Sequence, residues 1–246
     1  MPDIYYCSEP NYTPVSELPA AQLFDDEEAT RYKRMQARVA ARFAQARWMV
    51  KSLLAKRLQA PLENIRFAYS ENGKPHLPNH PELHFSISHC DDAVAISISD
   101  FPSGVDVELI ERRRGKLEPP WEKPEVFMHQ HTARWLDLVE PADKPQMFTI
   151  LWTLLESQVK VCDSSITVAS RHLEIDIKNH QAPWQLSYRA CKALPPVVWQ
   201  SFLNWGDDAG KRVISVAQLA SQATEPVALY DWVSAEPVAV SAIAKS

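Results

Sequence analysis

The stretch Gly104 to Glu108 reads GVDVE and decides how the rest of the chain is interpreted. Val105 and Val107 alternate with Asp106 and Glu108, which is the period-two pattern of a half-buried strand. The valines are expected to pack on one face, and the two carboxylates to project from the other. The stretch therefore predicts a strand that presents two oxygen ligands side by side.

A second motif, Trp152 to Lys160, reads WTLLESQVK and predicts a helix. Glu156 and Lys160 lie one turn apart, where their side chains are neighbours on the helix surface. They border an apolar stripe whose members recur at helical spacing. The stripe consists of Phe148, Leu151, Trp152, Leu155 and Val159.

Together the two motifs supply three carboxylates and a lysine, a set that suits magnesium-dependent attack on a phosphate ester. Magnesium binds oxygen ligands and keeps several waters, whereas zinc would require paired cysteines or histidines, and none lies nearby at ligand spacing. For either motif alone, a strand-end acidic pair or an ordinary salt bridge is the better interpretation. Their co-occurrence with further motifs upstream favours the metal site.

Three upstream segments complete the pattern. They are the turn Gly73–Leu77 (GKPHL), the strand end Phe85–Cys90 (FSISHC) and the strand Val94–Ile98 (VAISI). In this order and at these intervals, the chain resembles the 4'-phosphopantetheinyl transferases of the Sfp and AcpT type over roughly residues 30 to 165. An ordered set of motifs is far more specific than any one of them.

The resemblance implies a fold and a reaction. The fold is α+β, a pseudo-two-fold pair of similar halves with the active site in the cleft between them. In the reaction, coenzyme A donates its 4'-phosphopantetheine group to a serine of an apo acyl or peptidyl carrier protein and releases adenosine 3',5'-bisphosphate. Such phosphoryl transfer depends on a metal ion, on cations near the phosphates and on a base.

Site residues follow from the same resemblance, position by position. The metal ligands for Mg²⁺ would be Asp106, Glu108 and Glu156, and the catalytic residues Glu156, Lys160 and Asp106. The coenzyme A contacts would be Arg42, Lys74, Ser88, His89 and Lys160. The general base is either Glu156 or a metal-bound water, and the sequence does not choose between them.

Arg42 belongs to a run of arginines at spacings of three and four, which predicts a cationic ridge on the segment Phe24–Leu58, with a helix break before Ala37. A solvated basic face is the bland interpretation of this run. By the resemblance, Arg42 binds the 3'-phosphate, which suits a guanidinium. Arg31, Arg34 and Arg38 are left as coenzyme or carrier contacts.

Three positions depart from the family pattern. Leu155 stands where a lysine or arginine is usual, His131 stands where a glutamate is more frequent, and Cys90 replaces a serine or threonine. None of them removes the metal site. Leu155 and His131 nevertheless keep an alternative open, namely a weakly active or non-catalytic member that binds coenzyme A or a carrier protein.

Composition is that of a soluble cytoplasmic enzyme. The chain has 246 residues, 46% of them hydrophobic, a net charge of −5 and no apolar run of membrane-spanning length. The four cysteines are scattered without a CxxC, as expected of free thiols. An N-terminal half (1–103), a C-terminal half (104–235) with strands near 173–177, 184–188 and 213–217, and a tail (236–246) are predicted, in a monomer.

Other classes of protein fit less well. A serine hydrolase built on Ser88, His89 and Asp91 is disfavoured because adjacent strand residues point to opposite faces and no GxSxG elbow occurs. A nucleic-acid binder is disfavoured by the negative net charge and by the lack of a recognised binding motif. No membrane partner is expected either.

Overall fold

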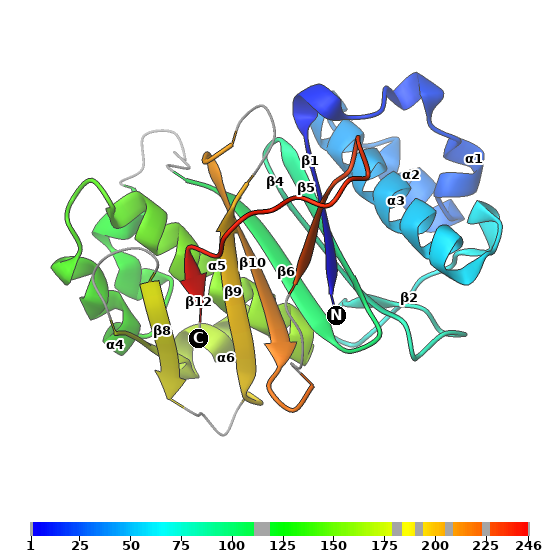
Figure 1. Cartoon of the computed structure of the whole chain (residues 1–246). Coiled ribbons are helices and arrows are strands. Elements are labelled where there is room, and N and C mark those ends of the chain that lie inside the picture. Colours follow the sequence, from blue (N-terminus) through cyan, green and yellow to red (C-terminus); the bar gives the residue numbers. More distant parts are fainter. Residues whose placement is uncertain are drawn as a thin grey trace.

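The structure, a computed structural model, describes residues 2–110, 119–178, 184–189, 194–204, 209–222 and 227–245. Helices and strands occur in both halves of the chain, so the predicted α+β class is confirmed (Figure 1). The α-helices are α1 (Ala20–Leu23), α2 (Asp26–Tyr32), α3 (Ala37–Leu58), α4 (Gln130–Ala133), α5 (Lys144–Cys162) and α6 (Ile166–His172). Short 3-10 helices are η1 (Glu9–Asn11), η2 (Val15–Glu17), η3 (Leu62–Asn64), η4 (Pro120–Glu122), η5 (Pro124–Val126) and η6 (Arg134–Leu138).

Two sheets form the centre of the molecule. The first has the order β11 (Ala228–Asp231), β1 (Asp3–Ser8), β5 (Ala93–Ser99) and β4 (His84–Cys90). The second has the order β6 (Ser103–Leu109), β10 (Arg212–Leu219), β9 (Val197–Leu203), β12 (Ala244–Lys245), β8 (Trp184–Arg189) and β7 (Glu174–Ile177). Neighbouring strands are antiparallel except β1 with β11 and β8 with β12. A small hairpin joins β2 (Ala68–Tyr69) to β3 (Pro75–His76).

The elements predicted from periodicity are present. GVDVE lies in β6, WTLLESQVK in α5, and the alternating segments of the C-terminal half in β7, β8 and β10. The predicted break before Ala37 separates α2 from α3. Because of this break the arginine ridge is not one helical face: Arg31 is in α2, Arg34 follows it, and only Arg38 and Arg42 belong to α3.

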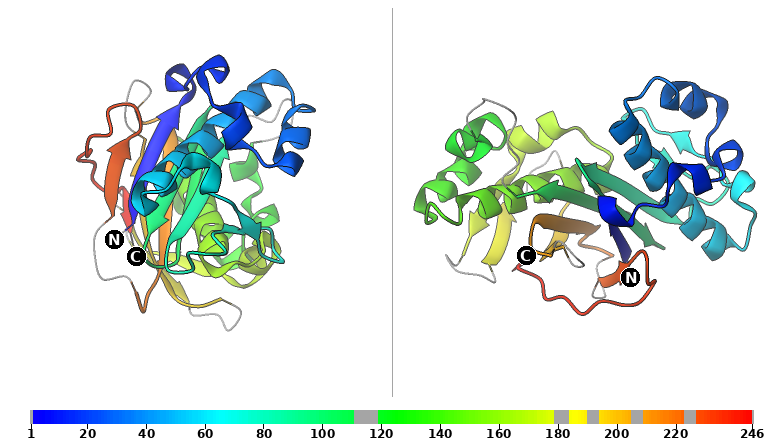
Figure 2. Two further views of the ribbon diagram at one scale, coloured as in Figure 1. Left: turned by 90° about the vertical axis from the view of Figure 1, so that its right-hand side faces the viewer. Right: turned by 90° about the horizontal axis from the view of Figure 1, so that it is seen from above.

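The C-terminal segment connects the two sheets. Strand β11 pairs with β1 in the first sheet, and β12, from the predicted tail, is inserted between β8 and β9 in the second. Between them the chain crosses both sheets, on the side away from α3 and α5 (Figure 2). Val238, Val240 and Ala242 pack there against a core that contains Val105 and Val107. The residues of the predicted tail thus form part of the core.

Helices α3 and α5 cover the opposite side. Met49, Val50 and Leu54 of α3 pack on Val94 and Ile96 of β5. The core of the C-terminal half forms around Met147, Ile150, Leu151 and Leu154 of α5, with Trp199 from β9. Burial of these side chains is the main stabilising term. Within the part of the chain that the structure describes, no helix is long and apolar enough to cross a membrane.

Candidate active site

The two motifs meet where α5 crosses β6, and a glycine permits their close approach. A methyl group on Gly104 would clash with the backbone carbonyl of Ser157 and crowd the backbone N–H of Val161, both in α5. Val105 and Val107 are fully buried on the far face of β6, as predicted. Asp106 therefore lies on the face that α5 covers.

Serine hydroxyls connect β6 to β4. The backbone N–H groups of Val105 and Val107 donate to Ser86 Oγ at 3.1 Å and to Ser88 Oγ at 3.2 Å. Side chains thus satisfy edge donors of β6 that would otherwise remain unpaired. This connection lies between the two sheets and places Ser88 directly beside Asp106.

Asp106 is held on one oxygen and unpartnered on the other. Its Oδ1 accepts hydrogen bonds from Ser88 Oγ at 2.6 Å and from Lys160 Nζ at 2.6 Å. Lys160 Nζ also donates to Ser88 Oγ at 2.9 Å and to the Val105 carbonyl at 3.1 Å. Asp106 Oδ2 is buried and has no hydrogen-bond partner among the described residues. A buried carboxylate oxygen without a partner is costly unless a cation binds it.

Glu156 lies one turn before Lys160 on α5 and interacts electrostatically with the same carboxylate. Desolvation raises the pKa of Glu156, the negative charge of Asp106 raises it further, and Lys160 opposes both. A desolvated carboxyl close to a second carboxylate is a cation-seeking arrangement, because a bound cation offsets the repulsion between them. Glu108, the third predicted ligand, lies on the same face of β6 and is partly exposed.

Asp106 and Glu156 suit a magnesium site that water and substrate complete, and not a site in which protein side chains supply every ligand. Among the residues that the structure describes, no three histidine, cysteine, aspartate or glutamate side chains are grouped closely enough to enclose a metal. Magnesium is commonly bound through one or two carboxylates, with waters and substrate phosphates completing its shell. The unpartnered Oδ2 of Asp106, with the Glu156 carboxyl close enough to interact with Asp106 electrostatically, is compatible with that description.

The positive charge of Arg42 lies near the neutral ring of His89 at the end of β4. Arg42 Nη1 donates to the Cys90 carbonyl at 2.8 Å, next to His89 in the chain. Although part of the His89 side chain reaches solvent, surrounding protein atoms desolvate the ring. This desolvation and the positive charge of Arg42 lower the pKa of His89 to about 4. A neutral imidazole beside a guanidinium can donate to an anion.

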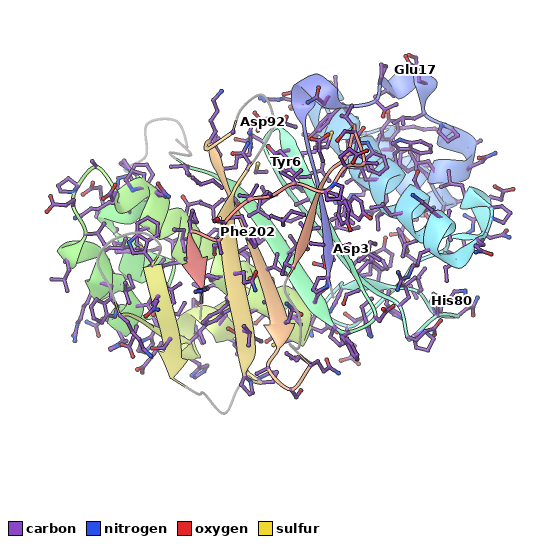
Figure 3. The ribbon with its side chains drawn as sticks, viewed as in Figure 1. Asp3, Tyr6, Glu17, His80, Asp92 and Phe202 are labelled. Atoms are coloured by element: carbon purple, nitrogen blue, oxygen red, sulfur yellow. The ribbon has the colours of Figure 1, made fainter. Side chains whose placement is uncertain are left out.

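Lys74 lies away from this group, in the turn that follows β2. It lines a cavity of about 400 Å³ together with His76, His80 and His84, and His80 marks this end of the molecule in Figure 3. Its Nζ lies 3.5 Å from the Val161 carbonyl in the last turn of α5. Burial lowers the pKa of Lys74, and Asp163 opposes that shift. The structure thus brings Ser88, Asp106, Glu156 and Lys160 together, whereas Lys74 approaches only the end of α5.

The three residues that depart from the family pattern do not remove any of the contacts just described. Leu155 is fully buried in the core of the C-terminal half. His131 Nε2 lies 2.5 Å from Asp176 Oδ1 on β7, so it faces the second sheet. Cys90 is a buried free thiol. Cys191 lies outside the described residues.

Sequence reasoning missed several side chains that shape this region. Ser86 lies two residues before Ser88 and repeats its contact with β6, and the FSIS alternation was the available signal. Asp163 and Ser70 form a hydrogen bond of 2.9 Å between segments far apart in the chain, which no local pattern reveals. Arg212 is fully buried beside Asp92, and its strand-like surroundings gave no indication of an ion pair.

Comparison with known proteins supports the resemblance that the sequence motifs indicate. Residues 13–100 match the family model described as "4'-phosphopantetheinyl transferase, N-terminal". The chain is 29% identical over 158 residues to the 4'-phosphopantetheinyl transferase gsp of Aneurinibacillus migulanus, an alignment that covers 64% of this chain and 62% of gsp. It is 29% identical over 167 residues to AcpT of Escherichia coli strain K12, covering 65% of this chain and 82% of AcpT.

A third relative, Sfp of Bacillus subtilis strain 168, is 29% identical over 113 residues, which is 46% of this chain and 47% of Sfp. The chain therefore spans less than two thirds of gsp and less than half of Sfp. The ordered motifs and these relatives show which class of protein the chain resembles. It is similar to 4'-phosphopantetheinyl transferases of the Sfp and AcpT type, and residues 13–100 match the N-terminal part of that family.

Proposed function

We propose that this protein transfers the 4'-phosphopantetheine group from coenzyme A to a serine of an apo acyl or peptidyl carrier protein, in a magnesium-dependent reaction of the holo-acyl-carrier-protein synthase type. The observation that carries the proposal is Asp106. Its Oδ1 is fixed by Ser88 and Lys160, while its buried Oδ2 has no partner among the described residues and lies near Glu156. Phosphoryl transfer needs such a cation-seeking carboxylate beside a lysine.

The chain's own residues would divide the work as follows. Asp106 and Glu156 would hold Mg²⁺, and Glu108, on the same face of β6, is the third predicted ligand. Bound magnesium would neutralise charge on the pyrophosphate oxygens. Lys160, freed from part of its contact with Asp106, would stabilise charge on the same phosphates. Arg42 and His89 would hold the 3'-phosphate at the end of β4.

The bond changes are those of a simple displacement. The carrier serine oxygen forms a bond to the phosphorus that bears the pantetheine arm, and the bond from that phosphorus to the bridging oxygen breaks. Adenosine 3',5'-bisphosphate leaves with the bridging oxygen, and the serine proton passes to a base. The base is either the Glu156 carboxylate or a water held at the metal, because a bound cation would offset the desolvation that raises the Glu156 pKa.

Further parts of this proposal concern the whole molecule. We infer that the two halves are related by a pseudo-two-fold axis, with coenzyme A bound between them, and that the protein acts as a cytoplasmic monomer. Strands β4 and β6, linked through Ser86 and Ser88, would then form the floor of the cleft. Lys74, which the resemblance makes a contact of the adenosine moiety, would approach the nucleotide from the turn that follows β2.

The experiment is direct. Purified protein is incubated with magnesium, coenzyme A and a panel of apo carrier proteins of acyl and peptidyl type, and each carrier is weighed by mass spectrometry. A gain of one phosphopantetheine group that disappears with chelator supports the proposal. If no carrier gains mass although coenzyme A binds, the protein is a non-catalytic binder. If coenzyme A does not bind either, the proposal is wrong.

A further inference from the structure

The turn between β2 and β3 is fastened to the C-terminal end of α5, although the two are about ninety residues apart in the chain. Ser70 Oγ donates to Asp163 Oδ1 at 2.9 Å. Asn72 Nδ2 donates to the Asp163 backbone carbonyl at 2.7 Å. One residue thus receives hydrogen bonds from two side chains of the same turn.

Ser70 relays this contact to Lys74. The Lys74 backbone N–H donates to Ser70 Oγ at 3.0 Å, so this hydroxyl bonds Asp163 and Lys74 at once. The Ser70 backbone N–H donates to the Lys74 carbonyl at 3.0 Å, and Gly73 N–H donates to the Ser70 carbonyl at 2.9 Å. Gly73 has φ +82°, which glycine adopts without strain. The turn is therefore a closed unit that Asp163 attaches to the end of α5, next to the longer contact of 3.5 Å from Lys74 Nζ to the Val161 carbonyl.

Asp163 occupies a position where glycine is the usual residue. It follows the last residue of α5 with φ 49° and ψ 53°, in the left-handed region. Glycine is preferred there because a side chain adds strain, and asparagine and aspartate are tolerated through local hydrogen bonds. The Asp163 backbone ends the helix three residues beyond Lys160, with its N–H donating to the Val159 carbonyl, while its side chain accepts the bond from Ser70.

We propose that Asp163 is a positioning residue for coenzyme A binding: through Ser70 it fixes the Lys74 turn on the helix that carries Glu156 and Lys160. The inference rests on the proposed function and deepens it. The nucleotide side of the site and the metal side come from different halves of the sequence, so their spacing must be set by contacts between them. The Asp163–Ser70–Lys74 chain is such a contact.

The test measures coenzyme A affinity by calorimetry at fixed magnesium, together with transfer kinetics. Asp163→Gly keeps the left-handed backbone and removes the acceptor, and Ser70→Ala removes the donor without touching α5. Each is expected to weaken coenzyme A about three- to tenfold, the effect of one lost hydrogen bond. Asp163→Asn retains an acceptor oxygen and should bind nearly as the unmodified protein does. The KM for the carrier should not change.

Two controls separate positioning from general stability. Gln59→Gly makes the same kind of change at the left-handed end of α3 and should leave coenzyme A affinity unchanged. In a Lys74→Ala background, Asp163→Gly should cause no further loss, because its effect passes through Lys74. Unchanged affinity in both Asp163→Gly and Ser70→Ala, or an equal loss with and without Lys74, overturns the inference while the proposed function stands. If the unmodified protein neither binds coenzyme A nor transfers its arm, both proposals fall.

Discussion

At the scale of single residues, Asp106 combines two environments in one side chain. The Oδ1 side is saturated by a hydroxyl and an ammonium group, and the Oδ2 side is buried without a partner among the described residues. The first environment fixes the carboxylate in place, and the second makes it available to a ligand. Because its position is set from one side only, the residue can bind a cation without rearranging.

This arrangement predicts that substitutions at the metal site can lower the transfer rate without lowering the stability of the fold. Asp106→Asn and Glu156→Gln should each lower transfer by at least about a hundredfold, the scale of losing a charge-stabilising group. Glu156→Gln should change the thermal midpoint little or raise it, since a desolvated carboxylate is removed. Turnover across a magnesium titration and a melting curve measure the two effects. Near-normal turnover of both variants at saturating magnesium would contradict the metal assignment.

The free energy of unfolding should depend on pH because of His89. Its pKa is lowered to about 4 from the ordinary 6.5, so the unfolded chain binds more protons than the folded protein between these values. The free energy of unfolding should therefore fall as the pH is lowered through this window. A phosphate bound beside the ring should raise the pKa of His89. NMR titration of the imidazole with and without coenzyme A tests this, with His89→Gln identifying the signal. A ring that titrates near 6.5 in the free protein would refute the prediction.

At the scale of elements, the packing of α5 on β6 depends on the absence of one side chain. Gly104→Ala would push a methyl group into the Ser157 carbonyl, which is backbone and cannot rotate away. We expect the free energy of unfolding to drop by about 1–3 kcal/mol, as for other overpacked sites. The transfer rate should fall by more than the fraction of unfolded protein accounts for, because α5 carries Glu156 and Lys160.

Gly210→Ala is the matched control, since Gly210 has open space around it and only a left-handed φ of +84°. It should cost about 1 kcal/mol from backbone strain and leave transfer unchanged. Denaturant unfolding gives the free energy of unfolding of both variants, and transfer assays give their rates. An active Gly104→Ala protein of normal stability would show that α5 does not need this close approach.

Leu155 tests whether α5 has lost a functional cation. It is fully buried among Leu151, Leu154 and other core residues, so Leu155→Lys would bury an ammonium group and should destabilise the fold by about 3 kcal/mol or more without raising transfer. The same substitution at Leu138, which is 63% exposed, should be nearly neutral. Thermal midpoints and turnover distinguish the cases. Higher turnover at an unchanged midpoint would mean that the lysine reaches the active site.

The elements were predictable because their signals are local. Alternation in GVDVE and the helical stripe of WTLLESQVK each occupy a few residues, and the structure has both as expected. The arginine ridge was wrong as a single face because the predicted break before Ala37 puts Arg31 and Arg38 on different helices, and spacing alone does not show how two helices lie relative to each other. The place of the last residues in the core was not predictable either, since β12 forms only when β8 and β9 already lie beside it.

The sequence indicated which residues belong to the candidate site, but not how their side chains contact one another. Asp106, Glu156, Lys160 and Ser88 were each singled out from their motifs, and their roles stay predictions. Their mutual contacts were not foreseeable: the hydrogen bond between Lys160 and Asp106 depends on how α5 lies across β6. The close approach at Gly104 sets that geometry, and a sequence shows only that the residue is glycine.

At the scale of the whole molecule, a buried network joins the two sheets near the end of β4. Arg212 of β10 donates to Asp92 in the turn after β4, with distances of 3.1 Å from Nε to Oδ1 and 2.6 Å from Nη2 to Oδ2. It also donates to the Tyr6 hydroxyl at 3.1 Å, and Asn204 Nδ2 donates to the same oxygen at 3.1 Å. Figure 3 shows Asp92 and Tyr6 close together at this end of the sheets. The network thus complements the Asp163 contact at the turn after β2.

Breaking this network on one side should be costly. Asp92→Asn removes the carboxylate oxygen that lies 2.6 Å from the Arg212 guanidinium, which is only 2% exposed, and should lower the free energy of unfolding by about 3 kcal/mol. Arg212→Met should cost less, because the partly exposed Asp92 carboxylate can be solvated, and adding Asp92→Asn to it should cost little more. Arg38→Met, which breaks the exposed pair with Glu9, is the control and should cost less than about 1 kcal/mol. Chemical denaturation of the four variants gives the coupling between Arg212 and Asp92, and strictly additive costs would show that the pair does not hold the two sheets together.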